Sequence, residues 1–423
     1  MKRVKVEHCL WALVSVLVGG VILGLTWTDG KVAVASANAA DIKIAVAYPL
    51  SGGLSRSGNL TVQGAKAAMA WVNDNGGIKS LGGAKLVPII GDTGSTVEGA
   101  ASAMDRLCRD PEIVMAMGSW ASSLTLASTE VTERLGIPQF SISLVDTLHD
   151  RGFKWGFYVS PPVSSLATTA VGNVLDLAKG LGHTVKTAMI VGDTQAASKF
   201  MYDSVKKFFP TVDVKVIGEE TWALGTLTDA TPVMQKVRSL NPDLVIFNPT
   251  ALTETQMCLM KRKEVGITTP FITGGYAADP SFKKIGADVL EGMTLYTQFY
   301  PHKHWPQDWI KRTLDQCKKE YSDEPWVGQD LGYAWSMVPV MAEILEKAAS
   351  RDRETIRQVA HKIDLHDVTA TRGFVKQGIA FDEKGRIEKK YQGLVLVQWQ
   401  SGVPVVVYPS DLAVAKPIWG GKK

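Results

Sequence analysis

After the first forty residues, short apolar segments alternate with segments that have helical apolar spacing, and this rhythm constrains the fold more than any other feature. Residues 42–47 predict a strand, 60–72 a helix and 85–90 the next strand. Such alternation requires crossover connections between strands and therefore predicts a mostly parallel sheet. The rhythm restarts with a helix at 164–181 and a strand at 187–191, which indicates a second α/β unit.

The connection between the two units is predicted at 158–162, because Pro161-Pro162 can continue neither a helix nor an inner strand and suits a hinge. The last third then breaks the rhythm, with three helices predicted at 309–321, 332–349 and 354–363. Short strands are expected after them, at 373–375, 379–381, 394–399 and 403–407. A helical block cannot bury its apolar faces alone, so we expect it to pack onto an earlier unit. About 380 residues also exceed what one core organises, so two domains are expected.

Residues 1–40 have the organisation of a secretory signal peptide. Lys2, Arg3 and Lys5 are basic, an apolar run covers 10–25, and Ala37-Asn38-Ala39 offers a small-residue cleavage site. The alternative is an uncleaved N-terminal anchor, because the apolar run is nearly long enough to span a bilayer. We expect cleavage and export, since no basic stop-transfer cluster follows the run.

The charge balance argues against nucleic acid as a partner. The whole chain carries a formal charge of +4, and removing four basic and two acidic residues with the signal peptide leaves +2. Charges of both signs are interspersed, whereas nucleic-acid binding usually needs a concentrated basic surface.

The mature chain retains Cys108, Cys258 and Cys317, an odd number at wide and irregular spacing. This spacing gives neither a zinc pattern nor a disulfide framework. We interpret the three as small buried apolar residues, with one disulfide and one free thiol as the alternative.

Catalytic and cofactor motifs are absent from the sequence. It contains no GxSxG, HExxH or GxxxxGK[ST] pattern. The glycine-rich segment 91–94 lacks the third glycine of a dinucleotide fingerprint, so we interpret it as a turn. His302 and His304 have no acidic or cysteine neighbour in the sequence, which favours a solvated loop over a metal site. We therefore expect no enzyme activity, no cofactor and no metal.

Ligands of open parallel sheets bind beyond the carboxyl ends of the strands. The segments expected there are rich in small hydroxyl side chains, and several combine these with backbone N–H groups at a helix start, an arrangement that favours anionic or strongly polar ligand groups. Their ranges are 48–57, 118–123, 141–145, 192–197, 248–252 and 274–278, so Ala121, Ser141, Asp193 and Asn248 become candidate ligand residues.

A set of landmarks in this order resembles the periplasmic branched-chain amino-acid-binding proteins of type I fold, over essentially the whole mature chain. The landmarks are Ile42 to Val46, Pro49-Leu50-Ser51-Gly52, Gly64-Ala65, Asn73 to Ile78, Asp92, Gly118 to Ser123, Gly136-Ile137-Pro138, Gly332-Tyr333-Ala334, Glu343 to Ala348 and Phe381 to Gly385. No single one is specific, but their order and spacing are.

The resemblance implies an α/β fold of two Rossmann-like lobes joined by a three-crossing hinge. It implies a first lobe of 41–160 plus 300–370 and a second of 161–299 plus 371–423. A small-molecule ligand would close the hinge, with its contacts favouring the closed state. Such a protein is expected in the periplasm as a monomer, delivering its ligand to ABC permease subunits in the inner membrane.

The family's ligand positions can be carried over one by one in the first lobe. Ser122 matches the serine that holds the ligand carboxylate, and Ser143 matches a position that supplies backbone contacts. Val145 stands where a threonine normally adds a hydroxyl, and Ser57 where some members place an aromatic side chain.

The second lobe departs further from the family. Asp193 leads into a segment without the aromatic residue usually found there. Gly275 stands where amino-acid binders carry an acidic residue for the ligand's α-ammonium group, with Tyr276 beside it. A buried ammonium without a carboxylate would cost several kcal/mol, so the sequence favours a carboxylate or amide without an α-amino group, with an aromatic acid as one candidate.

Aromatic and basic candidates fit such a ligand. Trp120 and Tyr276, one from each lobe, are predicted to sandwich a planar or apolar ligand body, Arg56 to reach a carboxylate, and Trp326 to be a further pocket candidate. Each of the three aromatic residues also has a core role as its alternative. The open alternatives for function are binding of a branched-chain or other amino acid, a periplasmic sensor for a signalling partner, and a secreted enzyme that uses Ser122 with a nearby base.

Overall fold

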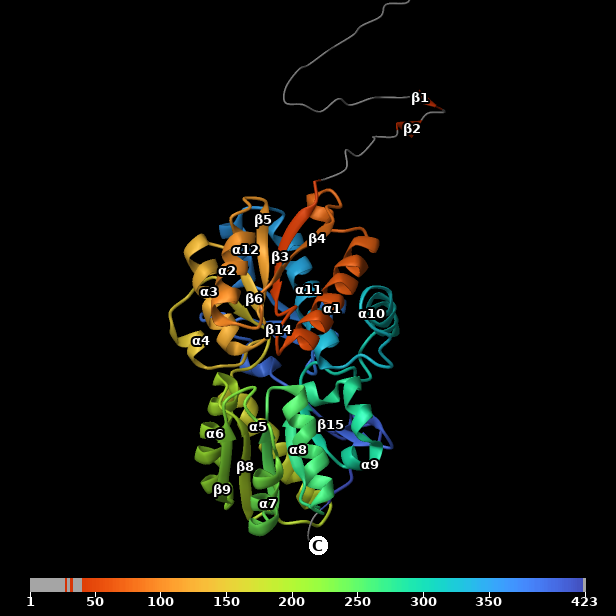
Figure 1. Cartoon of the computed structure of the whole chain (residues 1–423). Coiled ribbons are helices and arrows are strands. Elements are labelled where there is room, and N and C mark those ends of the chain that lie inside the picture. Colours follow the sequence, from red (N-terminus) through yellow and green to blue (C-terminus); the bar gives the residue numbers. More distant parts are fainter. Residues whose placement is uncertain (1–26, 29–30, 33–39, 421–423) are drawn as a thin grey trace, which may run out of the picture.

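The computed structural model describes residues 27–28, 31–32 and 40–420. The predicted signal-peptide cleavage site lies outside these residues, and the only elements described before residue 40 are β1 (Trp27–Thr28) and β2 (Lys31–Val32), which pair antiparallel. From residue 40 the chain forms two lobes, one above the other in Figure 1. The prediction of two α/β units is confirmed.

The first lobe is built on a five-stranded parallel sheet in the order β4-β3-β5-β6-β7. Its central strands read as continuous apolar runs because helices cover both faces, and all six residues of β5 are buried. The strands are β3 (Ile42–Tyr48), β4 (Leu86–Asp92), β5 (Ile113–Gly118), β6 (Gln139–Ser141) and β7 (Gly156–Tyr158), and the helices among them are α1 (Ser55–Asp74), η1 (Lys79–Leu81), α2 (Val97–Cys108), α3 (Ser122–Leu135) and α4 (Thr147–Asp150).

The late helical block returns to this lobe, as expected from its apolar faces. It consists of α10 (Gln307–Glu320), α11 (Gln329–Ala348) and α12 (Arg353–Ala360). The indole rings of Trp309 and Trp335 stack with centroids 4.5 Å apart, and Trp71 of α1 packs edge-on against both. These contacts join α1 to helices more than 200 positions later in the chain.

The second lobe contains a seven-stranded sheet in the order β16-β15-β12-β11-β10-β8-β9, parallel except that β15 runs antiparallel to its neighbours β12 and β16. Its strands are β8 (Thr187–Asp193), β9 (Lys215–Trp222), β10 (Leu244–Asn248), β11 (Phe271–Gly274), β12 (Thr294–Thr297), β15 (Val395–Gln400) and β16 (Val403–Tyr408). Its helices are α5 (Val163–Gly180), α6 (Ala196–Phe208), η2 (Phe209–Val212), α7 (Thr231–Leu240), α8 (Leu252–Glu264), η3 (Gly275–Ala278), η4 (Pro280–Ile285) and α9 (Ala287–Leu290).

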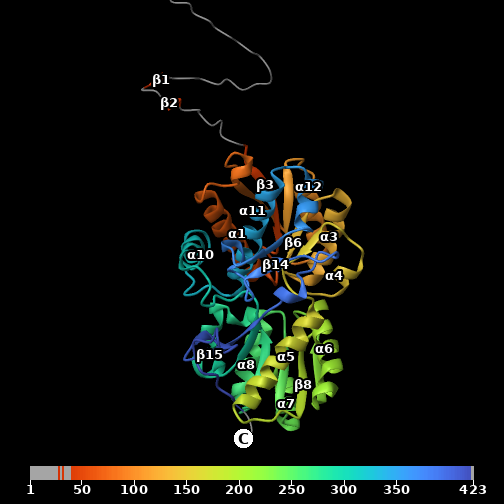
Figure 2. The same ribbon diagram turned by 180° about the vertical axis from the view of Figure 1, so that it is seen from behind.

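The last passage between the lobes lies later than the predicted boundary at 370/371. The antiparallel pair β13 (Asp364–His366) and β14 (Gly378–Ala380) stays with the first lobe, and Figure 2 shows β14 there from behind. The ring of Phe381 lies 6.1 Å from that of Phe140 and 5.2 Å from that of Phe157, centroid to centroid. Apolar burial therefore holds this segment, with η5 (Thr369–Thr371) and η6 (Lys389–Tyr391) on either side of β14, and Leu394 is the first residue after it that belongs to the buried second-lobe core. The strand predicted at 373–375 is a turn.

Candidate functional site: a cavity between the lobes

A cavity of about 120 Å³ lies between the two lobes, where strands from both sheets end. On the first-lobe side, lining residues stand just after the ends of β5 and β6. On the second-lobe side, they stand at or just after the ends of β8, β10, β11 and β12. The lining residues are Trp120, Ala121, Ser122, Ile142, Ser143, Leu144, Ser160, Leu166, Gln195, Ala197, Ser198, Asn248, Thr250, Gly274, Gly275, Tyr276, Tyr296, Thr297, Gln298, Phe299, Gln329 and Tyr333. Aspartate, glutamate, lysine, arginine and histidine are all absent from this lining.

Trp120 stands at the turn from β5 into α3 with a backbone φ of +74°. A bulky residue in the left-handed region is strained by about 1–3 kcal/mol, and such strain is concentrated at ligand sites. The indole N–H of Trp120 donates to the Asp330 carboxylate over 3.0 Å, which fixes the ring at the cavity wall.

The start of α3 supplies polar groups next to Trp120. No side chain caps its first turn, so its backbone N–H groups are available to an anion. The Ser122 hydroxyl accepts a hydrogen bond from the Leu144 N–H over 3.3 Å, which leaves its own proton free to be donated into the cavity. The Ser143 hydroxyl pairs with that of Thr125 at 2.5 Å.

The second-lobe wall is a network of uncharged hydrogen-bonding groups. The Tyr296 hydroxyl donates to Oδ1 of Asn248 over 3.0 Å, and Nδ2 of Asn248 donates to the Ser198 hydroxyl over 3.1 Å. The hydroxyls of Tyr276 and Thr273 lie 2.7 Å apart. Burial raises the pKa of Tyr276 and of Tyr296, so both stay neutral.

Gly275 is enclosed so tightly that no side chain fits. A Cβ atom there would lie 2.2 Å from Oε1 of Gln329 and 2.5 Å from Cβ of Thr297. The space that an acidic side chain at position 275 would need is therefore filled by two neutral residues. The cavity therefore has no carboxylate at position 275, and the structure leaves no room for one there.

Seven of the thirteen predicted ligand residues line the cavity, namely Trp120, Ala121, Ser122, Ser143, Asn248, Gly275 and Tyr276. Three others lie behind its wall and serve the fold. The Ser141 hydroxyl accepts the Ser143 N–H over 3.1 Å, and Val145 packs against Leu148 and Tyr158. Asp193 accepts the backbone N–H groups of Gln195 and Thr250, which orders two loops of the second lobe.

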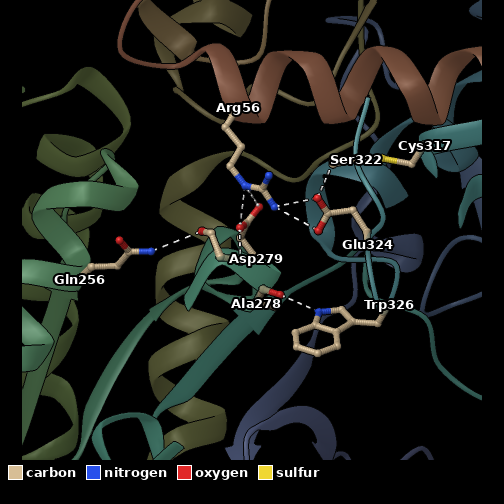
Figure 3. Close-up of polar contacts among 9 residues, drawn as sticks. Arg56, Gln256, Ala278, Asp279, Cys317, Ser322, Glu324 and Trp326 are labelled. Atoms are coloured by element: carbon tan, nitrogen blue, oxygen red, sulfur yellow. Dashed lines mark hydrogen bonds and ion pairs between the residues drawn. The ribbon is translucent and has the colours of Figure 1, made fainter. Parts of the chain in front are cut away.

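Arg56, Ser57 and Trp326 lie outside the cavity lining as well. Arg56 does not point to a ligand carboxylate; it pairs with Asp279 and Glu324, as Figure 3 shows. Ser57 is buried in the first turns of α1. Trp326 donates its indole N–H to the Ala278 carbonyl over 2.8 Å and packs into the second-lobe core.

Sequence reasoning missed Asp330, which lies directly behind Trp120. Its side chain is buried and its second oxygen has no hydrogen-bond partner. Burial raises the pKa of this carboxyl to about 7, although the Trp120 N–H and the Ser57 hydroxyl oppose the rise. Gln298, Gln329 and Tyr333 were also missed; the two glutamines and the tyrosine enter the cavity from the end of β12 and the start of α11.

The described residues also place the cysteines and His302. All three mature cysteines in them are buried free thiols. His302 is buried, not solvated as predicted, and burial lowers its pKa to about 4. Residues 27–28, 31–32 and 40–420 contain no group of three or more His, Cys, Asp or Glu side chains that could hold a metal ion. Over the same residues, no helix is long and apolar enough to cross a membrane.

Comparisons with known proteins agree with the two-lobed fold. A family model described as periplasmic binding protein matches residues 41–402. A Leu/Ile/Val-binding protein homolog from Brucella abortus is 25% identical over 388 residues, covering 89% of this chain and 94% of the relative. A leucine-binding protein from Thermotoga maritima superposes with a TM-score of 0.72 at 22% identity, over 88% of this chain and all of that one. A solute-binding protein from R. palustris in complex with benzoate gives 0.71 at 15% identity, over 90% and 100%.

Proposed function

The chain belongs to the periplasmic binding protein family, in its branched-chain amino-acid-binding branch with type I fold, and from that premise we propose what it carries. It is a monomeric receptor outside the cytoplasmic membrane that closes two lobes over one small carboxylate or amide without an α-amino group. It delivers that ligand to the permease of an ABC importer.

The uncharged cavity wall around Gly275 is the observation that carries this proposal. A zwitterionic amino acid would bury its ammonium group where the lining offers no carboxylate, at a cost of several kcal/mol. Gln329 and Thr297 fill the space in which an acidic side chain would stand. A ligand without the ammonium group avoids this cost.

The first-lobe wall supports a carboxylate or amide oxygen as the polar end of the ligand. The uncapped start of α3 presents N–H groups, and the Ser122 proton is free. Both favour an anion or a strong acceptor without requiring a basic side chain.

The size and aromatic walls support a ring as the apolar end. A cavity of about 120 Å³ is close to the roughly 150 Å³ that holds benzene in an engineered protein core. Trp120 and Tyr276 approach from opposite lobes, where offset or edge-on contacts with a ring are favourable. A neighbour of the same fold is in complex with benzoate.

Thermal unfolding with matched ligand pairs tests the proposal, because a ligand that binds only the native state raises the melting temperature. The pairs are 4-methylpentanoate with leucine and phenylacetate with phenylglycine, together with benzoate and benzamide. We expect stabilisation by members that lack the amino group and none by their amino-acid partners. Stabilisation by leucine, isoleucine or valine alone would instead support the amino-acid cargo of the named relatives.

A further inference from the structure

Arg56 stands where helix electrostatics disfavour a cation. It is the second residue of α1, whose first turn contains no acidic side chain. The positive end of the helix macrodipole lies there, so a basic side chain needs carboxylate partners from elsewhere. The structure supplies two, neither of them from α1.

The two carboxylates come from opposite sides of the cleft. Nε of Arg56 lies 2.8 and 2.9 Å from the two oxygens of Asp279, which stands between η3 and η4 of the second lobe. Its Nη2 atom lies 3.0 Å from both oxygens of Glu324, in the segment before α11 (Figure 3). The guanidinium group thus ties α1 of the first lobe to the second lobe.

The carboxylates that Arg56 pairs with are almost fully buried, so breaking these ion pairs is costly. The Asp279 and Glu324 side chains are 2% and 4% exposed, and that of Arg56 is 28% exposed. Burial opposes the charge of Arg56, but the two carboxylates outweigh it and raise the Arg56 pKa. A buried carboxylate that loses its partner is strongly disfavoured, so the lobes can separate only if water replaces Arg56 at Asp279.

The segment that carries Glu324 is fastened to both lobes. Glu324 holds Arg56, and two residues later the indole N–H of Trp326 binds the Ala278 carbonyl, directly before Asp279. Figure 3 shows the contacts of Arg56 and of Trp326 next to each other, at the adjacent residues Asp279 and Ala278. Arg56 borders a separate hollow of about 290 Å³ and does not line the ligand cavity.

We propose that Arg56, through Asp279 and Glu324, holds the two lobes closed and so sets how long the ligand stays bound without touching it. This inference rests on the proposed function, because closure matters only to a protein that traps a ligand. A ligand that needs the closed state binds in proportion to the closed fraction. Loosening the ion pair therefore speeds dissociation and leaves association nearly unchanged.

Stopped-flow and equilibrium binding of benzoate test the inference in the wild type, Arg56→Ala, Asp279→Ala and the double variant. Each single change is expected to raise the dissociation rate and Kd about tenfold or more. The double variant should bind benzoate no more weakly than the weaker-binding single variant, because each single substitution already breaks the Arg56–Asp279 pair. The ratio of the Kd values for benzoate and cyclohexanecarboxylate should not change, because the lining is untouched.

Arg312→Ala is the matched control. Arg312 also joins two carboxylates, Asp74 at 2.6 Å and Asp308 at 2.9 Å, but both belong to first-lobe helices. Its removal should leave the benzoate Kd unchanged. Arg56→Lys keeps the positive charge but loses the forked geometry of the guanidinium group. It should give a Kd between those of the wild type and Arg56→Ala, which a general folding defect at position 56 would not produce.

Small-angle scattering of the unliganded proteins separates this inference from the proposed function. If the wild type binds no benzoate, benzoate is not the cargo, yet a larger radius of gyration for Arg56→Ala than for wild type and Arg312→Ala still supports a role of Arg56 in holding the lobes closed. Wild-type dissociation kinetics in Arg56→Ala would overturn it. Equal radii in a protein that binds no benzoate would overturn it as well.

Discussion

At the residue scale, Trp120 and Asp330 form a hydrogen-bonded pair in which each residue has an energetically unfavourable feature. Trp120 has a left-handed backbone, and the buried Asp330 carboxyl has one oxygen without a partner. Their hydrogen bond links α11 to the cavity wall. We infer that the pair fixes the indole plane against which the ligand packs.

The raised pKa of Asp330 gives a pH-dependent stability with a definite sign. Its pKa rises from 3.8 in the unfolded chain to about 7 in the folded one, so the folded state holds the proton more tightly. Its stabilising contribution is complete below pH 4 and is lost as the pH rises through 7. Relative to Asp330→Asn, the wild-type free energy of unfolding should fall by about 2–3 kcal/mol between pH 5 and 8, as measured by urea denaturation.

Asp352→Asn serves as the control for this titration. Asp352 caps α12 and its hydrogen bonds to Thr355 lower its pKa, so its contribution is present above its unfolded pKa and is lost on the acid side. Parallel wild-type and Asp330→Asn curves from pH 5 to 8 would contradict the assigned burial of Asp330.

At the element scale, the strand-end rule explains which site residues the sequence could predict. Trp120, Ser122, Asn248 and Tyr276 follow predicted parallel strands, and the carboxyl ends of such strands gather at one edge. Gln298 was not predicted as a site residue because β12, the strand it follows, was not predicted. Gln329 and Tyr333 reach the cavity only because α11 packs back onto the first lobe, and local sequence contains no signal for such a contact.

The ion-pair partners of charged residues could not be predicted from the sequence either. Arg56 lies 223 positions from Asp279 and 268 from Glu324, so a free arginine near a strand end looked like a ligand for an anion. The tertiary fold instead supplies two carboxylates. Long-range pairing is set by the packing of whole elements, which periodicity does not reveal.

The packing of α1 against α11 gives an element-scale prediction about glycine. A Cβ atom on Gly64 of α1 would lie 2.3 Å from the backbone oxygen of Leu331, whereas one on Gly172 of α5 would meet nothing within 4 Å. Gly64→Ala should therefore lower the free energy of unfolding by about 1–3 kcal/mol through overpacking. Gly172→Ala should raise it by roughly 0.5–1 kcal/mol, because alanine favours helices.

Denaturant unfolding of both variants checks the pair. The opposite signs exclude an explanation from helix propensity alone, since that term is the same for both substitutions. Stabilisation by Gly64→Ala would show that α1 and α11 are not in close backbone contact.

At the scale of the whole molecule, alternation of strands and helices was enough to predict two lobes, and the resemblance predicted their discontinuous composition. The last passage was misplaced because residues 371–391 contain too little regular structure to assign locally. Their place follows from Ile379 and Phe381, which complete the first core. The two lobes meet over a cavity without charged side chains, and the ion pair between Arg56 and Asp279, outside that cavity, is proposed to keep them together.

Calorimetric titration of ligand-free protein comprising residues 41–423 tests the central claim most directly. Leucine and 4-methylpentanoate, which differ chiefly in the α-amino group, are titrated with benzoate as the aromatic acid. The account predicts saturable binding of one acid per chain and no binding of leucine. Tight one-to-one binding of leucine, with none of either acid, would contradict it.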